Sequence, residues 1–195
     1  MRKLLPSFYA KDRSTWRRWL KSNHKKENNV WLILHKKGST KPSVSYVEAV
    51  EEGLCFGWID SVANKRDDTT FVMYFASRKP KSVWSKINKE RIHRMISTGL
   101  MMPAGLLKIE EAKKDGSWST LDSVDNLLMP PVLKKGFSKS KKALKNFEGF
   151  PSSVKKQIYH WVNTAKREET LKKRIEETVT LAAKNIRANQ WEKKQ

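Results

Sequence analysis

The chain has 195 residues, of which 38% are hydrophobic and 31% are charged, and its formal net charge at pH 7 is +21. Its 8 tryptophans and 7 phenylalanines supply enough apolar surface for a core, so the composition excludes a disordered protein. A single cysteine excludes an internal disulfide, and no apolar run reaches the roughly 20 residues of a membrane-spanning helix.

The positive charge is distributed along the chain and is densest in its last third. Residues 1–133 carry 24 Lys and Arg against 14 Asp and Glu, whereas residues 134–195 carry 17 against 6. Such a surface attracts polyanions, although a solvated basic surface is the simpler explanation. The amino-terminus has no apolar run of signal-peptide length, which with the lone cysteine predicts a cytoplasmic protein.

Two helices are expected in the first third of the chain. The first is capped by Asp12 or Ser14, and its apolar face consists of Trp16, Trp19 and Leu20. The second begins at a capping box, in which a serine and a glutamate three residues later satisfy each other's backbone N–H groups. This second helix is expected to start at Ser45 and Glu48.

Three short segments rich in β-branched and aromatic residues are predicted strands: residues 30–35, 58–62 and 69–75. Polar residues between the last two predict a hairpin. With helices before and between the strands, the pattern predicts an α+β fold whose small, mostly antiparallel sheet is covered by helices on one face.

Two further helices are expected before residue 117. The first starts at Ser82 or Ser85 and the second at Pro103. Their expected apolar faces comprise Ile87, Ile92, Met95 and Ile96 in the first helix, and Leu106, Leu107 and Ile109 in the second.

The periodicity divides the chain into an α+β domain, a connecting segment and an all-helical module. The expected bounds are residues 1–116, 117–136 and 137–195. The connecting segment contains Met129-Pro130-Pro131 and has a weak pattern. The last part predicts a very basic helix followed by two amphipathic helices, which are expected to pack as a helical hairpin.

No catalytic, metal or cofactor motif accompanies these elements. The four histidines are scattered, and neither glycine-rich phosphate-binding pattern is present. Cys55 lies between apolar neighbours and is expected to be a buried, inert thiol. We therefore assign no catalytic residue, metal or cofactor, and we favour a non-enzymatic protein.

One constellation suggests a ligand-binding cleft. Asp60 follows an apolar strand and can pair with Arg78 across the hairpin, while Trp84 and Asn88 share a helix face. If these groups converge, they form a cleft with an indole wall. The cleft comprises Trp58, Asp60, Arg78, Trp84, Ser85 and Asn88. A purely structural role for the same residues stays open, because tryptophan mostly packs in cores.

Two alternatives to ligand binding remain. The basic stretches 78–81 and 134–145 interleave with Trp84 and Phe137, whose rings are expected to stack on single-stranded bases if the protein binds nucleic acid. An uncharacterised enzyme that uses Asp60 as a general base, in a cleft with Arg78 and Asn88, is the other alternative.

Several motifs together resemble the YdeI/OmpD-associated family, whose members are also called bacteriocin-protection proteins. The motifs span most of the chain: Ser45-Tyr46-x-Glu48-Ala49-Val50-Glu51-Glu52, Cys55-Phe56-Gly57-Trp58-Ile59-Asp60, Arg78-Lys79-Pro80-x-Ser82-x-Trp84-Ser85-x-x-Asn88 and Ala165-Lys166-Arg167-x-Glu169-Thr170. Glu168 stands where the family often has proline.

This resemblance implies a bacterial stress-tolerance protein that is linked to resistance against bacteriocins or cationic antimicrobial peptides. Some relatives are associated with an outer-membrane porin, but no established reaction comes with the family. The expected partner is an unknown small ligand or protein, and non-specific binding of nucleic acid or another polyanion is an additional expectation.

Overall fold

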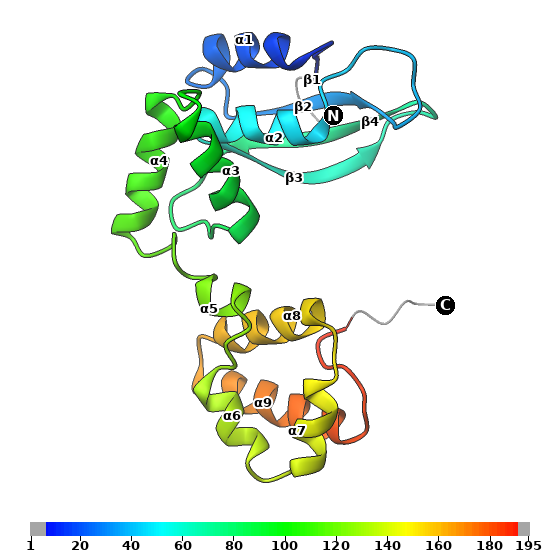
Figure 1. Ribbon diagram of the computed structural model, residues 1–195, viewed down its shortest axis with the longest axis vertical. Coiled ribbons are helices and arrows are strands. Elements are labelled where there is room, and N and C mark those ends of the chain that lie inside the picture. The colour runs from blue at the N-terminus through cyan, green and yellow to red at the C-terminus, as the bar shows by residue number, and fades with distance from the viewer. Residues whose placement is uncertain (1–6, 191–195) are drawn as a thin grey trace, which may run out of the picture. The chain divides into compact units, whose positions relative to one another are not determined.

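The computed structural model describes residues 7–190. The chain divides into two compact units, Met1–Thr120 and Leu121–Gln195, which we call unit 1 and unit 2. Unit 1 contains the sheet and four helices among its described residues, and unit 2 is helical (Figure 1). This architecture confirms the predicted α+β fold with a carboxy-terminal helical part.

A four-stranded sheet forms the centre of unit 1, in the strand order β1-β2-β4-β3. Strand β4 is antiparallel to both of its neighbours, β2 and β3, whereas β1 runs parallel to β2. The strands are β1 (Ser7–Tyr9), β2 (Asn29–His35), β3 (Trp58–Lys65) and β4 (Thr70–Ser77). The three predicted strands are confirmed, and β1 was missed because three residues are too short to show a strand pattern.

Helices α1 (Arg13–Asn23) and α2 (Tyr46–Cys55) cover one face of this sheet. The ring of Trp16 on α1 lies 5.3 Å from that of Phe75 on β4, and its Nε1 donates to the carbonyl oxygen of Ala49 on α2 at 3.0 Å. The predicted caps are confirmed: Asp12 caps α1, and a complete capping box begins α2.

Helices α3 (Lys86–Ser97) and α4 (Pro103–Lys114) complete unit 1, but their predicted apolar faces are partly wrong. Ile92, Met95 and Ile109 are buried as expected. The four larger residues expected beside them are exposed: Ile87, Ile96, Leu106 and Leu107.

Small residues, which a pattern of large apolar residues does not reveal, determine how α4 packs. A Cβ at Gly105 would lie 2.3 Å from the carbonyl oxygen of Cys55, so only glycine permits this approach of α4 to the end of α2. Ala112, two turns further on, is also buried. The buried face of α4 is therefore the one that allows close backbone contact.

Unit 2 packs its helices around a cluster of aromatic rings. Phe147 lies at its centre, with the rings of Phe137, Phe150 and Tyr159 at 4.9, 5.7 and 5.9 Å. The helices are α5 (Asp122–Asp125), α6 (Pro131–Phe137), α7 (Lys141–Glu148), α8 (Ser152–Asn163) and α9 (Glu168–Ala183). Among residues 7–190, no helix is long and apolar enough to cross a membrane.

Candidate functional site

The six residues of the predicted cleft occupy different environments. Trp58 is a core residue, 1% exposed, and its Nε1 lies 3.4 Å from the carbonyl oxygen of His24. Ser85 is the N-cap of α3 and accepts from the backbone N–H of Asn88. Both residues therefore have a structural role in the folded chain. The other four residues lie in two neighbouring places: Asp60 with Asn88, and Arg78 with Trp84.

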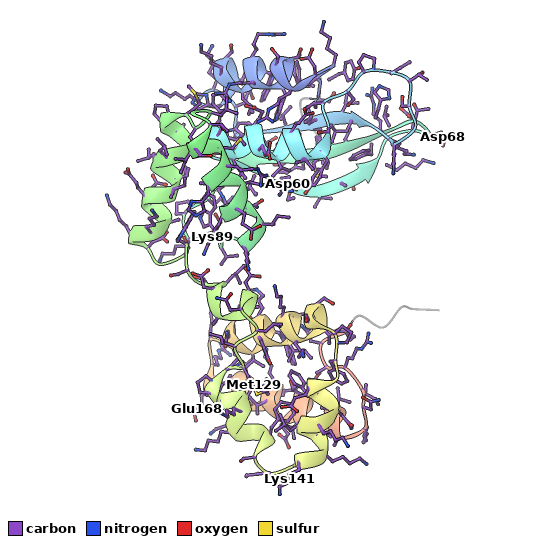
Figure 2. All side chains as sticks on the ribbon, in the orientation of Figure 1. Asp60, Asp68, Lys89, Met129, Lys141 and Glu168 are labelled. Atoms are coloured by element: carbon purple, nitrogen blue, oxygen red, sulfur yellow. The ribbon has the colours of Figure 1, made fainter. Side chains whose placement is uncertain are left out.

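The first place is an Asp60 cluster, which we define as Tyr46, Asp60, Asn88 and Arg91. The Tyr46 hydroxyl donates to the Asp60 carboxylate at 2.8 Å, and the Arg91 guanidinium donates to the side-chain oxygen of Asn88 at 2.8 Å. Figure 2 shows Asp60 beside α2, and Asp68 at the far tip of the same hairpin.

The pKa of Tyr46 depends on charges in both hydrogen-bonded pairs of this cluster, Tyr46–Asp60 and Arg91–Asn88. Burial, and then the hydrogen bond to Asp60, raise the pKa of Tyr46, while the nearby positive charge of Arg91 acts in the opposite direction. The hydroxyl therefore keeps its proton at neutral pH and acts as a donor. Together the cluster presents a hydroxyl, a carboxylate, an amide and a guanidinium, a set suited to recognising a polar ligand.

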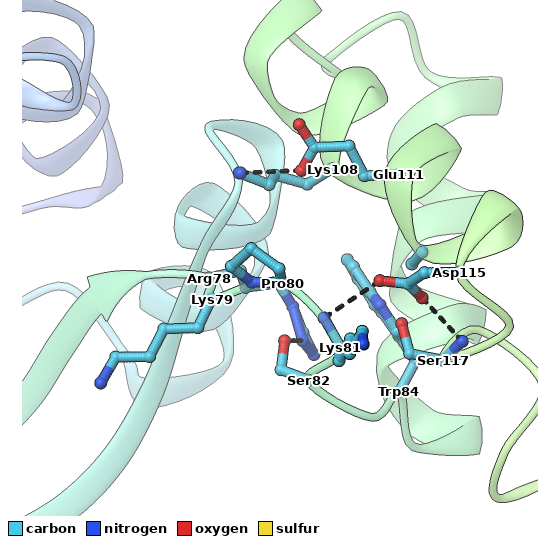
Figure 3. Close-up of a pocket in the computed structure, with 11 residues that line it drawn as sticks. Arg78, Lys79, Pro80, Lys81, Ser82, Trp84, Lys108, Glu111, Asp115 and Ser117 are labelled. Atoms are coloured by element: carbon cyan, nitrogen blue, oxygen red, sulfur yellow. Dashed lines mark hydrogen bonds and ion pairs between the residues drawn. The ribbon is translucent and has the colours of Figure 1, made fainter.

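The second place is a small cavity beside Arg78. The Arg78 guanidinium lies flat on Trp84, with Cζ 3.5 Å from the ring centroid (Figure 3). Arg78 Nη2 donates to the carbonyl oxygen of Val83 at 3.1 Å. Arg78 Nε and Ser117 Oγ are buried and have no hydrogen-bond partner.

The cavity between the Arg78 loop and α4 measures about 10 Å³ and is lined by both Arg78 and Ser117. This volume is about that of a single water site. The indole of Trp84 is 2% exposed and forms part of the cavity wall.

Arg78 and Asp60 influence each other without a direct contact. Burial lowers the pKa of Arg78 to about 10, and the negative charge of Asp60 acts in the opposite direction. Asp60 accepts instead from Tyr46, and its strand register places it opposite Phe75. Among the described residues, Arg78 and Asp60 form no ion pair, so they lie in adjacent places and not in one closed cleft.

A buried ion-pair network beside the cysteine was not predicted. Glu52 is 1% exposed and binds two guanidinium groups, Arg13 Nε at 2.7 Å and Arg17 Nη1 at 2.6 Å. Its neighbour Glu51 binds Arg13 at 3.0 Å and Arg94 at 2.7 Å. The sequence contained one signal of this network, the adjacent acids Glu51 and Glu52 in the apolar part of α2. Acids in such a position are expected to be buried, and buried carboxylates require cationic partners.

Cys55 lies next to this network and is buried, as predicted. Burial, followed by the negative charge of Glu52, raises the pKa of the thiol to about 11. A thiol with this pKa is protonated at neutral pH and is a poor nucleophile. Among the described residues, no group of three or more His, Cys, Asp or Glu is placed to hold a metal ion.

The stacking role expected for Trp84 and Phe137 is wrong. Trp84 is 2% exposed and Phe137 is 1% exposed, so neither ring can receive a base. Trp84 packs instead between Arg78 and Trp118, whose ring lies 5.1 Å away, and Phe137 belongs to the core of unit 2. Both aromatic residues stand among lysines in the sequence, but the fold turns the rings inward and leaves the charges outside.

Two family models match the chain. Residues 8–108 match a domain of unknown function (DUF8412), and this range contains the Asp60 cluster, Arg78 and Trp84. Residues 126–185 match a model described as bacteriocin-protection, YdeI or OmpD-associated (OmdA), and this range lies within unit 2. No curated protein and no solved structure matches the chain.

Proposed function

The chain belongs to the YdeI/OmpD-associated, or bacteriocin-protection, family and carries a DUF8412 domain, and from this membership we propose that it raises tolerance to bacteriocins or cationic antimicrobial peptides. We further propose that it acts in the cytoplasm by binding a small ligand or a protein partner. The observation that carries this proposal is the family match over residues 126–185.

The charge of the protein restricts how such tolerance can arise. A protein of net charge +21 repels cationic peptides over the range that salt leaves unscreened. Direct capture of a cationic peptide by the general surface is therefore unfavourable. This repulsion favours a mechanism in which the protein binds a neutral or anionic component of the cell, and not the toxic peptide itself.

We assign the ligand contacts to the Asp60 cluster. The carboxylate of Asp60 is half-buried and is held by Tyr46 at 2.8 Å, so its orientation is fixed before any ligand arrives. Asn88 uses its oxygen on Arg91, which leaves its amide N–H groups as donors for a ligand. A site of this kind recognises a molecule that offers both donors and acceptors.

Survival of a deletion strain under bacteriocins and cationic antimicrobial peptides tests the proposal. We expect lower survival than the wild type, with recovery when the intact gene is supplied. Supplying Asp60→Asn or Tyr46→Phe should restore survival only in part. Asp68→Asn, which changes an exposed aspartate at the tip of the same hairpin, is the matched control and should restore it fully.

Two results contradict the proposal at different levels. A deletion strain that survives each challenge as well as the wild type removes the tolerance function. Full recovery with Asp60→Asn and with Tyr46→Phe, at protein levels equal to the wild type by immunoblot, removes the site and leaves the tolerance function in place.

A further inference from the structure

The face of the sheet opposite α1 and α2 carries a set of aromatic side chains. Along β2, Val30, Leu32 and Leu34 are almost fully buried on the helix-covered side, and the intervening residues point to the other side. We call that other side the outer face. Its aromatic residues, named by strand, are Tyr9 on β1, Trp31 and His35 on β2, and Tyr74 on β4.

The rings form two pairs along the outer face. Trp31 and Tyr74 are cross-strand neighbours with centroids 5.1 Å apart, and Tyr9 and His35 have centroids 5.7 Å apart. In this sheet the rings of Trp31, His35 and Tyr74 are half-buried, and Tyr9 is 39% exposed. Trp31 and His35 are four residues apart on one strand, so the pairs are separated by about 13 Å.

Cations gather at one edge of the outer face, where β1 and β2 end and the β3–β4 turn begins. The edge cations are Lys11, Lys36, Lys37, Lys41 and Arg66. Lys36 donates to two backbone carbonyls of the turn, at 2.9 Å each, so its charge is held in position without being neutralised.

The acids at the same edge are already engaged in local contacts. Asp12 caps α1, Asp67 accepts hydrogen bonds from Thr69 and Thr70, and Asp68 pairs with Lys65 at 3.0 Å. Asp12 and Asp67 keep their negative charge, but the five edge cations outnumber these two acids, so the edge retains an excess of positive charge. A row of half-exposed rings beside unneutralised cations combines a stacking surface with a phosphate-binding surface.

We propose that the outer face of unit 1 binds single-stranded nucleic acid. Trp31, Tyr74 and Tyr9 stack on unpaired bases, and the cations of the adjoining edge contact the phosphates. A four-stranded sheet with exposed aromatic rings is an established way to hold two or three bases. A duplex does not fit this mode, because its bases are stacked on one another and cannot reach the rings.

The charge favours this occupant over a second copy of the chain. Two molecules of net charge +21 repel each other, whereas a polyanion is attracted and releases its condensed counterions on binding. The inference goes beyond the proposed tolerance function, because it involves a different face of unit 1 and does not use the Asp60 cluster.

Fluorescence anisotropy with labelled 12-nucleotide DNA and RNA, and with a 12-base-pair duplex, tests the inference at two salt concentrations. We expect Trp31→Leu and Tyr74→Leu each to weaken single-strand binding by about 5- to 150-fold, the effect of losing one stacked base. The dependence on salt should stay the same in these variants. Lys37→Gln and Arg66→Gln should instead each reduce the salt slope by about 1.

Trp161→Leu is the matched control, because Trp161 is also half-exposed but lies on α8, with the Arg174 guanidinium 5.1 Å from its ring. This variant should bind like the wild type. Trp31→Phe keeps a ring and should retain most of the affinity, which separates the loss of stacking from other effects of the substitution. Tyr74→Leu tests the same face independently if Trp31→Leu does not fold.

Three results overturn the inference. Wild-type affinity in both Trp31→Leu and Tyr74→Leu, or equal losses in Tyr74→Leu and Trp161→Leu, shows that charge alone accounts for binding. Tighter binding of duplex than of single strands excludes stacking on the sheet. Self-association that sedimentation detects in the wild type but not in Tyr74→Leu identifies the outer face as a contact between copies of the chain.

Discussion

The guanidinium of Arg78 lies on the ring of Trp84, with 3.5 Å between Cζ and the ring centroid. Arg78 is only 5% exposed, and among the described residues no carboxylate is bound to its guanidinium. The indole face, a carbonyl oxygen and a serine hydroxyl replace the counter-ion that a buried arginine normally has.

Arg78→Lys should lower the free energy of unfolding by about 1–3 kcal/mol. An ammonium group cannot stack flat on the indole or donate in the same fixed directions, but it carries the same charge into the same buried place. Urea denaturation monitored by circular dichroism measures the change. Lys79→Arg, at the exposed next position, should stay within about 0.5 kcal/mol of the wild type. Equal stabilities of the wild type and Arg78→Lys would show that the stack contributes nothing.

Glu52→Gln should destabilise unit 1 by about 2–4 kcal/mol, because it leaves Arg13 and Arg17 without the carboxylate that both of them bind. The lower part of this range reflects the partial exposure of the two arginine side chains, 31% and 27%. Thermal and urea unfolding at pH 7 measure the loss. Glu90→Gln alters an exposed glutamate of α3 and serves as the control, with an expected change below about 0.5 kcal/mol. A Glu52→Gln protein as stable as this control would contradict the network's role.

Asp67 should make the β3–β4 turn sensitive to acid. Hydrogen bonds from the Thr70 side chain and from the backbone N–H groups of Thr69 and Thr70 lower the pKa of its carboxyl below the ordinary value of 3.8. Its contribution is therefore present above pH 3.8 and is lost as the pH falls toward the lower folded-state pKa.

Amide hydrogen exchange, recorded by NMR from pH 5 downward, measures this effect in the turn. Protection of the Thr70 amide should decrease toward low pH in the wild type. In Asp67→Ala the protection should be low throughout and should not show this decrease. A Thr70 amide that is equally protected in the two proteins at pH 5 would refute the assignment.

Cys55 should not react with a thiol reagent until unit 1 unfolds. Burial is the main reason that its pKa is raised from 9.0 to about 11, so almost no thiolate exists at pH 8. A disulfide-exchange reagent should therefore modify one thiol per chain in 8 M urea and none on the same timescale in native buffer. The thiol ionises near pH 9.0 in the unfolded chain but only near pH 11 in the folded protein. The stability that this raised pKa contributes is therefore present below pH 9.0 and is lost as the pH rises toward 11. Rapid modification in native buffer would show that the thiol is accessible.

Local interactions made much of the fold predictable. Asp12 and Ser45 cap their helices through groups only three residues away, so the helix starts can be recognised without knowledge of the rest of the chain. The same holds for the polar turn between β3 and β4. The faces of α3 and α4 were harder to predict, because Gly105 faces the core through a fit to the backbone of α2 and not through its hydrophobicity.

The candidate site was predictable only as a set of residues. The sequence by itself determined the α+β class, the basic character of the chain and the motifs that contain Asp60, Arg78 and Asn88. Only the tertiary structure paired Asp60 with Tyr46, laid Arg78 on Trp84 and placed Arg13 against Glu52. Each of these contacts joins side chains that no helix or strand period brings together. Periodicity and capping do not specify which of several possible partners a long polar side chain meets once the helices have packed.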